Sequence, residues 1–104
     1  MKTFFINPKL QEYIFSFEKP TISKFTRLTD LLETFGQKLG MPYSKQIETN
    51  LYELRIRGKQ EVRVFYCFYQ NTIVFVHASV KKSQKIPQQD MKTALSRIKL
   101  LTGV

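Results

Sequence analysis

Residues 51–80 read LYELRIRGKQEVRVFYCFYQNTIVFVHASV, and this stretch decides the fold. Polar turns at residues 58–60 and 70–71 divide it into three runs rich in β-branched and aromatic residues, which are typical of strands. The run 51–57 alternates between apolar and charged residues, as a half-buried strand does. The run 72–80 is almost entirely apolar, which indicates a strand covered on both faces. The stretch therefore predicts a three-stranded antiparallel meander.

The same alternation predicts which side chains share a face of the sheet. On the first two strands, one face is apolar and aromatic, and the other carries the arginines. The apolar face takes Tyr52, Leu54, Ile56, Val62, Val64, Tyr66 and Phe68, and the other takes Glu53, Arg55, Arg57, Arg63, Phe65, Cys67 and Tyr69. On the third strand, His77 shares its parity with Ile73 and Phe75, which favours a hydrogen-bonded core histidine over a general base. Cys67 is interpreted as a small buried side chain.

The flanking segments predict helices. Asn7-Pro8 resembles an N-cap followed by proline at the first helical position, which predicts a helix over residues 8–17. A second helix follows, capped by Thr21 or Ser23 and ended by Gly36 or Gly40, with a short strand near residues 45–49. Residues 87–101 form an amphipathic helix that packs back on the sheet or docks a partner. Residues 1–104 thus predict a single α+β domain: two N-terminal helices on a three- or four-stranded, mainly antiparallel twisted sheet, with a C-terminal helix.

The charge of the chain is high and unevenly distributed. The formal net charge is +9, of which residues 1–52 carry +2 and residues 53–104 carry +7. This asymmetry indicates an anionic partner, which is a nucleic acid, an acidic protein segment or a membrane surface. The single cysteine, the lack of a signal peptide and the lack of an apolar run of about 20 residues favour a reduced, cytoplasmic setting without a membrane anchor.

The basic residues form the one pattern that suggests chemistry. Lys81, Lys82 and Lys85 follow the third strand, and Arg55 and Arg63 lie on neighbouring strands with no evident acidic partner. Guanidinium groups hold phosphate oxygens in pairs and stabilise the charge of a phosphodiester transition state. RNA supplies its own nucleophile, the 2′-hydroxyl, so lysines would need only to transfer protons. Plain RNA binding and charges that serve solubility remain open alternatives.

Other catalytic patterns are not found in the sequence. The single His and the single Cys have no metal-ligand spacing, the eight carboxylates form no close pair, and no glycine-rich phosphate loop occurs. No metal and no cofactor are therefore expected. Tyr69 lies on the same predicted face as Arg63, where it is a candidate for stacking on a base.

Four segments together resemble a known family. They are Leu51–Ile56, Arg63–Tyr66, His77-Ala78 and the stretch KKSQKIP at Lys81–Pro87, and their order and spacing resemble the phage-derived, HigB-like branch of the RelE/ParE toxin superfamily. The resemblance covers roughly residues 32–100. Ser79 departs from it, because members often have an aromatic residue there, and residues 1–31 inherit only a helical expectation.

The resemblance implies a RelE-like fold and a type II toxin, an endoribonuclease that cleaves mRNA on the ribosome. It implies a cognate acidic antitoxin, expected to be a helix-turn-helix protein, and contact with DNA only through that complex. The antitoxin would lie across the basic face or pack on the helix 91–101. We expect the catalytic residues to be Arg55, Arg63 and Lys82, and the RNA-binding residues to be Lys81, Lys85, Arg57, Lys45 and Tyr69. A ParE-like inhibitor of a protein such as gyrase and a non-catalytic RNA-binding module are the competing hypotheses.

Overall fold

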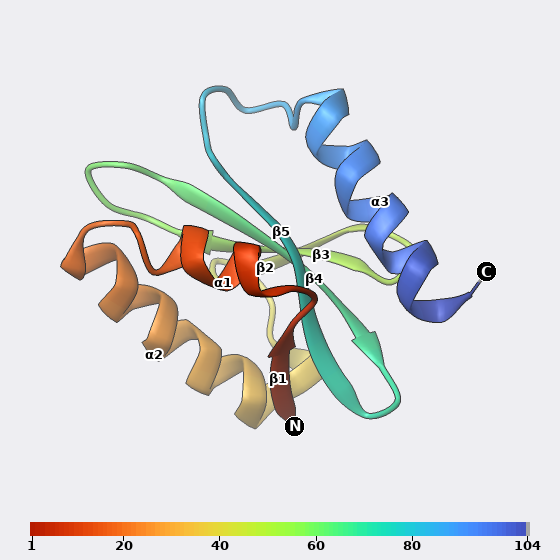
Figure 1. Cartoon of the computed structure of the whole chain (residues 1–104). Coiled ribbons are helices and arrows are strands. Elements are labelled where there is room, and N and C mark those ends of the chain that lie inside the picture. The colour runs from red at the N-terminus through yellow and green to blue at the C-terminus, as the bar shows by residue number, and fades with distance from the viewer. Residues whose placement is uncertain (104) are drawn as a thin grey trace.

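The computed structural model describes residues 1–103 and contains one five-stranded sheet and three α-helices (Figure 1). The strands are β1 (Lys2–Phe5), β2 (Ser44–Glu48), β3 (Leu51–Ile56), β4 (Val62–Tyr69) and β5 (Thr72–Val80). The helices are α1 (Pro8–Ile14), α2 (Lys19–Phe35) and α3 (Gln88–Thr102), and a short 3-10 helix, Gly36–Lys38, follows α2. Across residues 1–103, every helix is too short or too polar to cross a membrane.

The predicted meander is confirmed. Strands β2, β3, β4 and β5 are neighbours in that order, and each pair is antiparallel. The tight turn between β4 and β5 consists of Gln70 and Asn71, both with positive φ (48° and 60°), as a two-residue hairpin turn requires. The register places Arg55 of β3 opposite Arg63 of β4, and Arg63 opposite Ser79 of β5. Both predicted arginines therefore lie in one row across the sheet.

The predicted number of strands is wrong, because the N-terminal residues form a further strand. β1 pairs in parallel with β5, from Lys2 opposite Thr72 to Phe5 opposite Phe75, so the sheet is mixed. The outer edge of β1 is tied to α2, since the Thr3 amide and hydroxyl both donate to the Glu33 carboxylate, at 3.1 and 2.8 Å. The helices also lie differently from the prediction, because α1 and α2 follow a strand. Helix α3 covers the opposite face of the sheet from α1 and α2.

The helix ends follow capping chemistry, with two corrections. Asn7 caps α1 as predicted, because its side-chain oxygen accepts from the Leu10 amide at 2.8 Å, but the helix ends at Ile14 rather than residue 17. The second helix begins at Lys19, ahead of both predicted caps. Proline in a first helical turn loses no hydrogen bond, so Pro20 is accommodated at the start of this helix. Gly36, with φ of 56°, ends α2.

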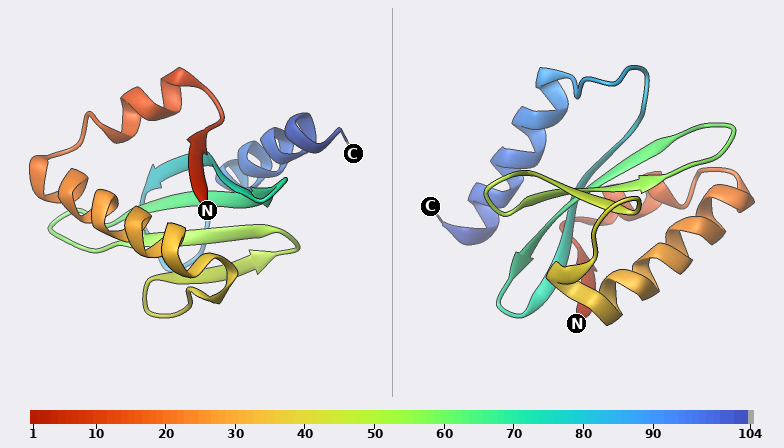
Figure 2. Two further views of the ribbon diagram at one scale, coloured as in Figure 1. Left: turned by 90° about the horizontal axis from the view of Figure 1, so that it is seen from below. Right: turned by 180° about the vertical axis from the view of Figure 1, so that it is seen from behind.

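The sheet separates two apolar cores. Helices α1 and α2 lie on one side of the sheet and α3 lies on the other (Figure 2). Side chains of β3, β4 and β5 pack against α1 and α2, and a smaller cluster packs against α3. Phe65 and Cys67 belong to the second cluster, as the strand alternation predicts. Ala94 of α3 is fully buried against it. Of the two roles left open for the terminal helix, the structure shows the first, packing back on the sheet.

His77 lies on the opposite face from the one predicted. The pairing of β4 with β5 shifts register between Phe65 and Tyr66, and this β-bulge reverses the alternation along β5. His77 therefore stacks on Phe65, with ring centroids 5.7 Å apart, and its Nε2 lies 2.8 Å from Asp90 Oδ1 of α3. The interpretation as a hydrogen-bonded histidine is confirmed, although its partner comes from the terminal helix.

Candidate functional site

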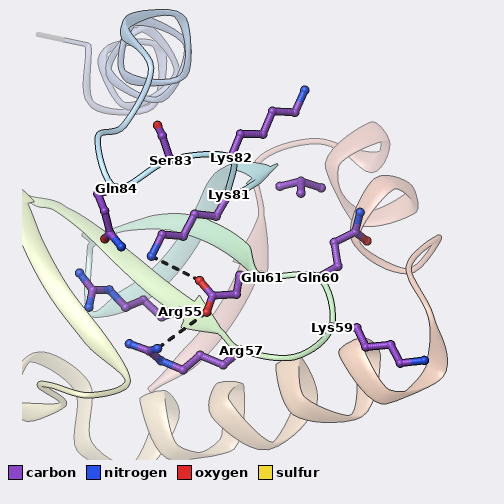
Figure 3. Close-up of a pocket in the computed structure, with 10 residues that line it drawn as sticks. Arg55, Arg57, Lys59, Gln60, Glu61, Lys81, Lys82, Ser83 and Gln84 are labelled. Atoms are coloured by element: carbon purple, nitrogen blue, oxygen red, sulfur yellow. Dashed lines mark ion pairs between the residues drawn. The ribbon is translucent and has the colours of Figure 1, made fainter.

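An open cavity of about 580 Å³ lies at one end of the sheet, between the β3–β4 turn and the start of the β5–α3 loop (Figure 3). These two connections approach each other because β3, β4 and β5 are adjacent antiparallel strands. The cavity is lined by Arg55, Arg57, Lys59, Gln60, Glu61, Val80, Lys81, Lys82, Ser83 and Gln84. Five of these ten residues are Lys or Arg and one is acidic, so the cavity is suited to an anion.

One buried carboxylate organises the arginine row. Glu53 Oε1 accepts from Arg55 Nε at 2.6 Å, and Glu53 Oε2 lies 3.0 Å from Arg63 Nε. Two guanidinium groups directly opposite each other on a sheet would repel, and the shared carboxylate offsets that repulsion. The sequence-based expectation that these cations lack acidic partners is therefore wrong.

The two arginines have different environments. The Arg63 side chain is 5% exposed, and its Nη2 donates to the carbonyl oxygens of Ser83 and Gln84, at 2.8 Å each. Arg55 is 24% exposed and reaches the cavity, and among the described residues the only hydrogen bond of its side chain uses Nε. Arg63 thus holds the β5–α3 loop through two of its carbonyl oxygens. Arg55 lines the cavity with its terminal Nη atoms free to bind a ligand. Behind the cavity, both line a recess of about 10 Å³, enough for roughly one water molecule.

The acidic residue of the cavity, Glu61, lies between two cations. Its Oε2 is 3.3 Å from Lys81 Nζ, and its Oε1 is 3.7 Å from Arg57 Nη1 (Figure 3). The backbone supports the same arrangement, since the Lys81 amide donates to the Glu61 carbonyl at 2.8 Å. The Glu61 side chain is 37% exposed, so its carboxylate remains accessible to a ligand in the cavity.

The remaining predicted residues divide into two groups. Lys82 and Arg57 line the cavity, although the Lys82 side chain extends from the rim away from Glu61 (Figure 3). Lys85 and Lys45 are exposed but do not line the cavity. Tyr69 lies at the other end of β4 and packs against the cluster beneath α3.

Sequence reasoning missed Lys59, Glu53 and Glu61 as parts of the site. Lys59 was assigned only to the turn, and the turn forms one wall of the cavity. Glu53 shares a face with Arg55 by simple alternation, and Glu61 is four residues from Arg57 across the turn. Both spacings were visible in the sequence and indicated ion pairs.

Two other reactive side chains lie outside the site. Burial raises the pKa of the Cys67 thiol to about 11, so it is protonated and unreactive at neutral pH. Burial also raises the pKa of Tyr66 to about 12, with its hydroxyl hydrogen-bonded to Ser44. Among residues 1–103, His, Cys, Asp and Glu side chains form no group of three arranged to hold a metal ion.

Comparison with known proteins identifies a family. Residues 12–99 match the family described as phage derived protein Gp49-like (DUF891). The chain belongs to this family. No curated protein matches it.

Solved structures show the fold of this Gp49-like chain in another protein. One is a heterotetrameric YoeB-YefM toxin-antitoxin complex from Staphylococcus aureus, with a TM-score of 0.55 and 21% identity over 72% of this chain and 90% of that chain. Another is a YoeB-YefM complex from Staphylococcus aureus, with a TM-score of 0.57 and 22% identity over 80% of this chain and 97% of that chain. The predicted resemblance is thus confirmed for a phage-derived family and for a fold found in toxin-antitoxin complexes.

Proposed function

We propose that this Gp49-like chain is the toxin of a type II toxin–antitoxin pair, of the HigB-like branch, and cleaves mRNA on the ribosome in the cytoplasm. The observation that carries the proposal is the open cavity in which five cations surround a single carboxylate, Glu61. Its family membership and its fold, shared with chains of toxin–antitoxin complexes, support the same assignment.

The cations suit a phosphodiester. Arg55 offers two terminal nitrogens for bidentate contact with phosphate oxygens, and its orientation is fixed by Glu53. Lys81 and Arg57 add positive charge on either side of Glu61. Arg63 acts as a positioning residue, because it holds both Glu53 and the loop that carries Lys82.

The reaction needs no group beyond these side chains and the RNA. The 2′-hydroxyl oxygen forms a bond to phosphorus while its proton passes to the Glu61 carboxylate. The bond from phosphorus to the 5′-oxygen breaks, and that oxygen takes a proton from the Lys82 ammonium group. The products are a 2′,3′-cyclic phosphate and a 5′-hydroxyl. Each positioned proton transfer contributes about 10²–10⁴-fold in rate.

The test is cleavage of mRNA on translating ribosomes, with 5′ ends mapped by primer extension. Arg55→Ala, Glu61→Gln and Lys82→Ala should each lose cleavage, while Lys92→Ala, an exposed lysine of α3 outside the cavity, should not. Intact mRNA with the unmodified protein would overturn the nuclease. Intact mRNA together with a DNA-damage response would favour the gyrase-type inhibitor instead.

The proposed partner is an acidic antitoxin, expected to be a helix-turn-helix protein. The net charge of +9 favours an acidic protein, and the solved structures of similar fold are toxin–antitoxin complexes. Because the apolar stripe of α3 already packs on the sheet, the basic cavity is the better site for this protein. Co-expression with the neighbouring reading frame should suppress both toxicity and RNA cleavage.

A further inference from the structure

A second hollow lies on the other side of Arg55 and Arg57 from the cavity. It has a volume of about 180 Å³ and lies between α2 and the segment that leads into β2. Leu28, Pro42 and Tyr43 form its apolar wall, and Arg55 and Arg57 separate it from the first cavity. We refer to it as the Tyr43 hollow. A bound polymer that extends from the first cavity across Arg55 and Arg57 therefore reaches the Tyr43 hollow.

Tyr43 is exposed, and its backbone is fixed in place. The residue is 42% exposed, although a tyrosine ring is a large apolar surface. Its backbone is held on both sides, since the Tyr43 amide donates to the Gly40 carbonyl at 3.1 Å and the Arg55 amide donates to the Tyr43 carbonyl at 2.9 Å. The backbone that carries the ring is thus held directly beside Arg55, the residue proposed to hold the phosphate.

The charges around the hollow are all positive. Lys24 and Arg27 of α2 line it together with the two strand arginines, and none of the described lining residues is acidic. Lys24 also donates to the Arg57 carbonyl, which ties α2 to the end of β3. The carboxylates that pair with the two strand arginines, Glu53 and Glu61, do not line the hollow, whereas Glu61 lines the first cavity.

We propose that the Tyr43 hollow is a nucleobase subsite for single-stranded RNA, next to the phosphate held at Arg55. The base stacks on the Tyr43 ring, and Arg27 contacts the adjoining phosphate. An exposed aromatic ring beside several cations is the combination that binds single-stranded nucleic acids, since every base has a face to stack. An acidic peptide would use the cations but has no flat group for the ring. The inference rests on the proposed function, because it extends the RNA path from that site.

The test is equilibrium binding of a fluorescent 2′-O-methyl RNA hexamer, which lacks the attacking hydroxyl and stays intact. Tyr43→Ala should weaken binding by about fivefold to 150-fold, the range for loss of one stacked base. Tyr43→Phe keeps the ring and should bind within about twofold of the unmodified protein. Tyr13→Ala is the matched control, because Tyr13 is similarly exposed (41%) but lies on α1, away from the hollow.

An abasic hexamer with the same backbone separates stacking from charge. The unmodified protein should bind it as weakly as Tyr43→Ala binds the complete hexamer, and Tyr43→Ala should not distinguish the two. Equal binding of both hexamers by the unmodified protein would overturn the subsite. So would a Tyr43→Ala variant that loses affinity for polyglutamate but keeps it for RNA. Because the hexamer is not cleaved, absence of nuclease activity on ribosomes would leave this result unaffected.

Discussion

At the scale of single residues, Arg55 and Arg63 show that two arginines on the same face of a sheet can have different roles. Both contact the same carboxylate, yet only Arg63 is buried, with its guanidinium bound to Glu53 and to two loop carbonyls. Removing Arg63 leaves the buried Glu53 carboxylate with Arg55 as its one cationic partner and removes the donor of two loop carbonyls, which is costly at a buried site. Removing an accessible partner costs much less.

We therefore expect Arg63→Ala to lower the free energy of unfolding by about 3–5 kcal/mol, and Arg55→Ala by about 1 kcal/mol or less. Urea denaturation followed by circular dichroism measures both. If the two variants lost the same stability, the buried role of Arg63 would be wrong. Because of this cost, Arg55 is the better variant for testing catalysis.

A second prediction at this scale concerns alkaline pH. Burial raises the pKa of Cys67 to about 11 and that of Tyr66 to about 12, so the folded protein keeps these protons after the unfolded chain has lost them. Their contribution to stability is complete below the unfolded pKa values, near 9 and 10, and is lost as the pH rises through 11 and 12.

The free energy of unfolding should therefore fall between pH 9 and 11, by roughly 1.4 kcal/mol per pH unit from Cys67 alone. Urea melts at half-unit pH steps measure this slope. Cys67→Ala should flatten it over this range, whatever its effect at neutral pH, and an unchanged slope would contradict a buried neutral thiol. Tyr66→Phe should act in the same way about one pH unit higher.

At the scale of elements, the edge strand β1 depends on α2. Glu33 accepts from both the amide and the hydroxyl of Thr3, and its carbonyl accepts from the N-terminal amine at 2.8 Å. Hydrogen bonds to a charged group contribute about 1.5–3 kcal/mol each, so the Glu33 carboxylate is the main tie on this side of β1.

Glu33→Ala should consequently release β1 without unfolding the rest of the protein. Hydrogen exchange measured by mass spectrometry should speed up in residues 2–6 and along the adjoining part of β5, while α3 stays protected. Asp30→Ala, on an exposed position of the same helix, is the control. Faster exchange in α3 as well would show that β1 is not a separable unit.

The elements also show what sequence patterns can and cannot predict. The alternation in residues 51–69 assigned both faces of β3 and β4 correctly, because a strand without a bulge keeps a strict period of two. It failed for His77, since one extra residue in β5 reverses the faces and leaves no mark in composition. β1 was missed because four residues give too few positions for a pattern. The cavity followed from the meander, but the pairing of its cations required the positions of Glu53 and Glu61.

At the scale of the whole molecule, the effect of a charged residue on RNA binding can be distinguished from its effect on RNA cleavage. The net charge of +9 attracts RNA to every part of the basic surface, so removal of a cation weakens binding whether or not that cation takes part in the reaction. Glu61 is different, because it is the one acidic residue among those lining the cavity and it neutralises part of the charge of Lys81 and Arg57. Its removal should move affinity and rate in opposite directions.

Glu61→Gln should therefore bind uncleavable RNA several-fold more tightly than the unmodified protein, while cleaving mRNA about 10²–10⁴-fold more slowly. Freed from the carboxylate, Lys81 and Arg57 become available to phosphates, so the slope of log K against log salt should steepen by about 0.7 for each added contact with single-stranded RNA. Anisotropy titrations at several salt concentrations measure the affinity and the slope, and primer extension on ribosomes measures the rate. Arg57→Ala, which removes a cation beside the same carboxylate, is the matched comparison and should weaken binding. If Glu61→Gln bound RNA more tightly and still cleaved it at the full rate, Glu61 would only weaken RNA binding electrostatically. The proton acceptor would then have to be another group.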